Sequence, residues 1–85
     1  MPNRNYIKGR RKEYAIIHDE TLLGRVAFRS AGSHSPIDIV SIDTKNHIIR
    51  LIQSKPDDAP EILIRRLHLL NNKFNGDFNV RFEVR

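Results

Sequence analysis

Three stretches of the chain carry side chains that suit hydrolysis of a phosphodiester bond: Glu13, Asp38 and the tripeptide Gln53-Ser54-Lys55. Carboxylate and amide oxygens can hold a hard cation such as Mg²⁺, which usually takes only one or two protein carboxylates and keeps its waters. The cation acidifies a bound water and offsets charge on the pentacoordinate phosphate. A nearby lysine can orient that water and stabilise the developing charge. Together the three stretches favour a metal-dependent hydrolytic site.

Each stretch also has a purely structural explanation, which is the favoured one for Glu13 and for Gln53-Ser54-Lys55 when each is taken alone. Glu13 lies on the core-facing side of an expected helix, where it can pair with Arg10 three residues earlier. Asp38 interrupts an apolar strand and fits an edge position at which its carboxylate reaches water. Gln53-Ser54-Lys55 fits a polar strand end, from which Gln53 and Lys55 project to the same side. Only the combination of the three favours chemistry over structure.

The elements that must position these side chains follow from periodicity and turn signals. An amphipathic helix is expected from near Tyr6, capped by Asn5, to about Gly24. Strands are expected over residues 26–29, 37–42 and 47–54, the last of them buried on both faces. If the second and third of these strands pair, Asp38 lies beside Gln53 and Lys55.

A second helix and a last strand complete the chain. Asp58 is expected to cap the helix, with Pro60 in its first turn. Its apolar stripe consists of Leu63, Leu67, Leu70 and Phe74. Alternating apolar residues then predict a strand at Phe78, Val80, Phe82 and Val84. The order αβββαβ predicts a single layered α/β domain over residues 1–85.

Positive charge is concentrated at the start of the chain. Five cations precede the first acid, Glu13, while the remaining ten Lys/Arg and ten Asp/Glu balance, so the first twelve residues carry the whole formal excess of +5. Such a cluster is the usual electrostatic signature of a polyanion-binding surface, most often for nucleic acid. A solvated tail that keeps the protein soluble explains the cluster equally well.

The chemical residues and their order resemble a known family of nucleases. Asp38 followed by Gln53-Ser54-Lys55 is similar to the D…(D/E)-x-K signature of the PD-(D/E)XK, or restriction-endonuclease-like, nucleases, whose core is also αβββαβ. The closer resemblance is to archaeal Holliday-junction resolvases. Their K-G-x-x-x-E helix pattern is seen as Lys8-Gly9-Arg10-Arg11-Lys12-Glu13, and their R-S-A-G-S loop as Arg29-Ser30-Ala31-Gly32-Ser33. The motifs cover residues 8–55.

The resemblance implies a mixed central sheet flanked by helices and a role for each matching residue. Glu13, Asp38 and Gln53 would hold Mg²⁺, or Mn²⁺ in its place. Lys55 would be the catalytic lysine, and Ser33 would assist at the scissile phosphate. The residues implied to contact DNA phosphates are Lys8, Arg10, Arg11 and Arg29. The family's usual Glu is replaced by Gln53, which keeps a carbonyl ligand but loses one negative charge.

These observations predict a structure-selective DNA endonuclease that resolves four-way junctions as a homodimer, because two symmetry-related strands require two active sites. Three alternatives remain open: a nicking or restriction-type nuclease of the same fold, a catalytically inactive DNA-binding module, and a basic RNA-binding or ribosome-associated protein. The last leaves Asp38 and Lys55 unexplained. The chain has no cysteine and no apolar run long enough to span a bilayer, which predicts a cytoplasmic protein with no membrane partner.

Overall fold

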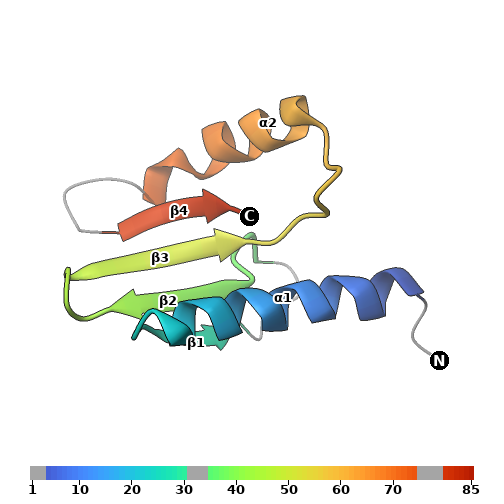
Figure 1. The fold of residues 1–85 in the computed structure, drawn as a ribbon. Helices are drawn as coiled ribbons and strands as arrows, with labels where there is room; N and C mark the ends of the chain where they lie inside the picture. Colours follow the sequence, from blue (N-terminus) through green and yellow to red (C-terminus); the bar gives the residue numbers. More distant parts are fainter. Residues whose placement is uncertain (1–3, 31–34, 75–79) are drawn as a thin grey trace.

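The computed structural model describes residues 4–30, 35–74 and 80–85, with side chains from residue 7 onward (Figure 1). Its elements in chain order are α1 (Arg4–Leu22), β1 (Val26–Arg29), β2 (Ile39–Asp43), β3 (Ile48–Gln53), α2 (Glu61–Asn71), the 3₁₀ turn η1 (Asn72–Phe74) and β4 (Val80–Val84). The predicted order of helices and strands is confirmed, and the fold is of the α/β class.

The sheet is mixed, with the strand order β1-β2-β3-β4. The first three strands form an antiparallel meander, and β4 pairs with β3 in parallel. A parallel neighbour requires a crossover connection, which α2 provides. Ile39 pairs with both Arg29 and Ile52, so the ends of β1 and β3 lie beside the start of β2.

The two helices cover opposite faces of this sheet. Ile16 of α1 packs with Ile39 and Ile52 in the hydrophobic core. The ring of Phe82 lies against His68 and Phe74, which places α2 and η1 on its side of the sheet. Ile52 pairs with Glu83, so Phe82, the preceding residue, points to the face opposite to Ile52. Figure 1 shows α1 running along β1 and β2 while α2 runs along β4.

The face on the α2 side is only partly covered. Val26 and Phe28 of β1 are 57% and 48% exposed, because α2 packs over β4 at the other edge. On α2 itself, Leu63 and Leu67 of the predicted stripe are half-buried, whereas Leu70 is 65% exposed. The predicted stripe is therefore buried at Leu63 and Leu67 only in part, and Leu70 lies outside the core.

Several element ends differ from the sequence prediction. α1 begins at Arg4, so Asn5 lies inside the helix and is not its cap. The helix ends as expected before Gly24, whose φ of 83° favours glycine. β3 begins only after His47, which adopts a left-handed φ of 57°, and its Ile49 is exposed, so burial on both faces was wrong for the first half of the strand.

The second helix also begins later than predicted. Pro60 occupies the N-cap position without a side-chain hydrogen bond, so Asp58 is not the cap. β4 starts at Val80, while Phe78 lies outside the described residues. None of the helices in the described part of the chain is long and apolar enough to cross a membrane.

Candidate active site at the ends of β2 and β3

Asp38 lies one residue before β2, not inside it as predicted. Its backbone nevertheless continues the sheet: its N–H donates to the carbonyl of Ile52 at 2.9 Å, and its own carbonyl accepts from the N–H of Ser30 at 2.8 Å. Its carboxylate oxygen Oδ2 accepts from the N–H of Ser54 at 2.8 Å. Asp38 is thus held where β1, β2 and β3 meet, and it lies beside the end of β3, as predicted from the pairing of the two strands.

Gln53 is the last residue of β3 and neighbours Asp38 across the β2–β3 ladder. The pairing of Ile39 with Ile52 places the residues before and after them opposite one another and on one side. The side chain of Gln53 is 9% exposed, and its Oε1 has no hydrogen-bond donor among the described residues. A buried carbonyl oxygen without a donor is costly, and a bound cation would satisfy it.

Lys55 follows β3 and is fixed through its backbone. Its N–H donates to the carbonyl of Arg85 at 2.8 Å, which extends the β3–β4 pairing beyond the strand end. Its carbonyl accepts a hydrogen bond from Nζ of Lys12 on α1. The residue is half-buried and lies where the chain leaves the sheet.

Glu13 is tied to the end of β1, not to Arg10. Its Oε2 accepts from Nε of Arg29 at 2.9 Å, and the Arg29 guanidinium lies 5.6 Å from the ring centre of Tyr14. The expected i−3 ion pair with Arg10 is therefore wrong. Arg29, predicted to contact DNA, makes these two contacts within the protein.

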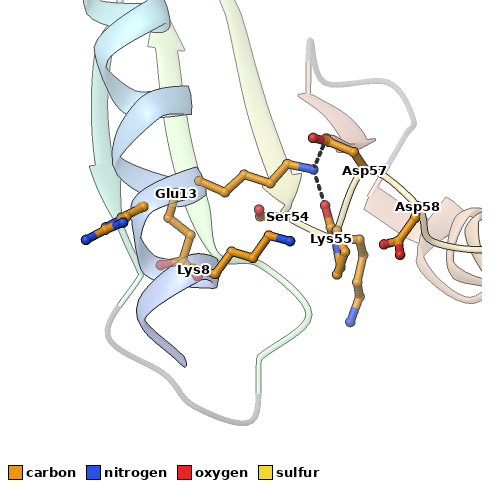
Figure 2. A pocket seen from close by; sticks show the side chains of 10 residues that line it. Lys8, Glu13, Ser54, Lys55, Asp57 and Asp58 are labelled. Atoms are coloured by element: carbon orange, nitrogen blue, oxygen red, sulfur yellow. Dashed lines mark hydrogen bonds and ion pairs between the residues drawn. The ribbon is translucent and has the colours of Figure 1, made fainter. Parts of the chain in front are cut away.

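A groove of about 790 Å³ brings part of the predicted site together (Figure 2). α1 contributes Lys8, Gly9, Arg11, Lys12 and Glu13 to one wall, and residues 54–58 form the other. In Figure 2 the Lys8 side chain extends from α1 toward Ser54 and Lys55. Asp38, Gln53 and Arg29 do not line the groove. Asp38 is connected to it only through the hydrogen bond that its carboxylate accepts from Ser54.

Other predicted residues lie elsewhere or are not described. Arg10 is exposed, and its guanidinium lies 6.0 Å from the ring centre of Tyr14, where a hydrogen bond and the positive charge lower the pKa of the tyrosine. Ser33 lies outside the described residues. Lys12 and Asp57 also line the groove and are joined by an ion pair of 2.8 Å, a contact that was not predicted. Their separation along the chain gives no sequence signal for that contact.

Among the described residues, few side chains can donate to a metal. Within residues 4–30, 35–74 and 80–85 no group of three or more His, Cys, Asp or Glu side chains is arranged to hold an ion. Asp38 and the amide of Gln53 supply oxygens at this end of the sheet, on the face opposite Ile39 and Ile52. Glu13 belongs to α1, which covers the other face, and is engaged by Arg29. This donor set fits a hydrated Mg²⁺ that keeps several of its waters, because such an ion needs only one or two carboxylates.

Comparison of the chain with protein-family models, with curated proteins and with solved structures gives no match in any of the three.

Proposed function

We propose that this protein is a metal-dependent DNA endonuclease with a restriction-endonuclease-like core, acting on four-way junctions. The observation that carries the proposal is the convergence at one end of the sheet. Glu13 of α1 lines the same groove as Ser54 and Lys55, and the N–H of Ser54 donates to the carboxylate of Asp38. Of these residues, Glu13, Asp38 and Lys55 are assigned to catalysis by the family resemblance, and they come from distant parts of the chain. The αβββαβ order and the parallel β4 support the same family.

Each of these residues has a defined task in the proposed site. Asp38 and Gln53 would hold Mg²⁺, which would supply an acidified water and offset phosphate charge. Glu13, which the family resemblance also assigns to the metal, would have to exchange its bond to Arg29 for one to the ion. The Lys55 ammonium orients that water and stabilises negative charge on the phosphate oxygens. Lys8 and Arg11 on the groove wall bind the phosphates that flank the scissile bond.

The decisive experiment measures cleavage of a labelled four-way junction and of plain duplex, with and without Mg²⁺, by wild type and Lys55→Ala. Loss of the lysine should reduce the cleavage rate by about 100-fold or more while junction affinity changes little, because charge stabilisation acts mainly in the transition state. Lys45→Ala is the matched control, since Lys45 is an exposed lysine in the β2–β3 turn, outside the groove. Full activity of Lys55→Ala would remove the lysine from the site.

A second candidate is an inactive DNA-binding module of the same fold. Two observations favour it: Gln53 stands where the family has an acid, and Glu13 is engaged by Arg29. Gln53→Glu distinguishes the two candidates, because it adds the missing charge at nearly constant side-chain length. For an enzyme, it should lower the Mg²⁺ concentration needed for half-maximal cleavage, with Gln53→Asn as the neutral control. Junction binding without cleavage by either protein, at any Mg²⁺ or Mn²⁺ concentration, would establish the inactive module.

We further propose that the protein acts as a homodimer. Large apolar side chains are exposed on the α2 side of the molecule, and exposed apolar surface often marks an interface. They are Val26, Phe28, Ile49, Ile62, Leu69 and Leu70. Light scattering at micromolar concentration should give twice the mass of one chain. A monomer both alone and on DNA would favour the nicking alternative.

A further inference from the structure

Lys12 differs from Lys8 and Arg11 on the same wall of the groove because its ammonium makes hydrogen bonds to the opposite wall. Its Nζ donates to the carbonyl of Lys55 and forms an ion pair of 2.8 Å with Oδ1 of Asp57; both contacts are drawn as dashed lines in Figure 2. Lys8 and Arg11, one turn and one residue earlier on α1, form no ion pair or hydrogen bond within the part of the chain that the structure describes. Lys12 is also partly buried, with 24% of its side chain exposed. It is therefore less available to a ligand than its neighbours.

The two contacts of Lys12 differ in strength. Asp57 is 98% exposed, and an ion pair to such a residue is screened by solvent and contributes little. The Lys55 carbonyl belongs to a half-buried residue, and a hydrogen bond from an ammonium to a partly desolvated carbonyl is among the stronger ones. The Lys55 carbonyl is thus the contact through which Lys12 can act on the site.

The backbone of Lys55 has few other restraints, since it lies beyond the end of β3. Its N–H is bound to the Arg85 carbonyl at the end of β4, and the following Pro56 disfavours a helical conformation at Lys55. Neither feature fixes the orientation of the peptide plane between Lys55 and Pro56. The bond from Lys12 fixes that plane and ties it to the helix that carries Glu13.

We propose that Lys12 is a positioning residue, which holds the Lys55 backbone so that the Lys55 ammonium is kept at a set place relative to Glu13. The proposal rests on the proposed nuclease function for its catalytic consequence. It assigns to Lys12 a role different from phosphate binding, although it belongs to the same basic run as Lys8 and Arg11.

The kinetic test compares Lys12→Met with Lys8→Met on a labelled junction. Methionine keeps a long stem and removes the ammonium. Lys12→Met should lower the single-turnover cleavage rate by up to about 100-fold, the cost of a misplaced catalytic group, with an unchanged dissociation constant. Lys8→Met should weaken binding and leave the rate at saturation unchanged. Lys12→Arg, which keeps a cationic donor, should restore part of the rate, and Asp57→Asn should behave as wild type.

Phosphate binding by Lys12 gives the opposite result and would overturn the proposal. In that case Lys12→Met weakens binding and reduces its salt dependence as Lys8→Met does, while the rate at saturation is retained. A large loss of rate in Asp57→Asn would also contradict the assignment to the Lys55 carbonyl.

A second measurement needs no DNA and stands even if the wild type does not cleave. Amide hydrogen exchange of the Lys55 N–H reports how firmly this backbone is held, and the amide of Ser41 in the middle of β2 reports global opening. Lys12→Met should accelerate exchange at Lys55 relative to Ser41, and Lys8→Met should not. Equal exchange at Lys55 in the two variants would refute the positioning role. If the wild type cleaves no DNA but exchange is accelerated in Lys12→Met, only the proposed nuclease function is refuted.

Discussion

Glu20, near the C-terminal end of α1, is bound by two arginines, whereas Lys8 and Arg11 near its other end form no ion pair among the described residues. Glu20 is 1% exposed; both of its oxygens accept from Nη1 of Arg25 at 2.9 and 2.8 Å, and Oε2 also accepts from Arg85 at 3.0 Å. Burial alone would raise the pKa of Glu20, but the hydrogen bonds from Arg85 and Arg25 lower it below its usual value.

The ion pairs of Glu20 are part of a network across the sheet in which each acid pairs with an arginine. Glu83 pairs with Arg85 at 2.8 Å and with Arg50 at 3.1 Å, and Arg50 reaches Asp43 at 3.4 Å. We call this set the ion network; its members are Glu20, Arg25, Asp43, Arg50, Glu83 and Arg85. Its three acids and three arginines satisfy one another, so its role is structural.

The groove end of the same helix is built differently. Its wall on α1 carries Lys8, Arg11 and Lys12, and of these Lys12 alone has a partner across the groove within the described residues. Exposed cations that form no ion pair attract a polyanion, whereas buried and paired ones do not. The two ends of α1 thus differ in the use of their charges: those of the ion network stabilise the fold, and those of the groove are available to a substrate. The residue types alone do not distinguish the two groups.

The largest expected effect lies in the ion network. Glu20→Ala leaves the guanidinium groups of Arg25 and Arg85 without their shared carboxylate, and breaking a buried ion pair costs about 3–5 kcal/mol. Urea denaturation of this variant should therefore give a much lower free energy of unfolding than wild type. Asp19→Ala is the control, because Asp19 is the exposed neighbouring acid. Equal stability of the two variants would mean that the network is not structural.

A smaller effect, on binding alone, is expected at the groove. Joint replacement of Lys8 and Arg11 by alanine should reduce the slope of log K against log salt by about two units, one for each lost phosphate contact, with little change in stability. Arg66 and Lys45 are exposed cations outside the groove, and their joint replacement supplies a charge-matched control. If both double variants lose the same slope, the groove is not the binding surface.

The smallest expected effect is on stability at low pH. Hydrogen bonds from the side chain and backbone of Asn46, and then from Arg50, lower the pKa of Asp43 to about 2. Because the folded-state pKa lies below the unfolded value of about 3.8, the stabilisation is present above that value and is lost as the pH falls toward 2. Denaturation midpoints at pH 5, 4, 3 and 2 should decline over this interval. Asp43→Asn should decline less steeply, and an identical decline would exclude Asp43 as a cause.

The sequence located the candidate site better than it located the charges that support the fold. Asp38, Gln53 and Lys55 could be associated because they flank a hairpin, whose pairing brings nearby residues together. The ion network escaped prediction, since Arg85 and Glu20 are distant in the chain and each alone resembles an ordinary surface charge. Asp43 lies just beyond the strand predicted over residues 37–42, although it ends β2 and is buried.

By itself, the sequence determined the order of helices and strands, because apolar periodicity and turn residues are local properties. It also determined the basic start of α1 and the chemical types at the ends of β2 and β3. Only the tertiary structure decided which charges are used internally. Glu13 pairs with Arg29, Lys12 reaches Lys55, and Lys8 and Arg11 are left open to the groove. The physical reason is that the strength and the partner of a charge depend on burial and on distance in space, and neither is fixed by spacing along the chain.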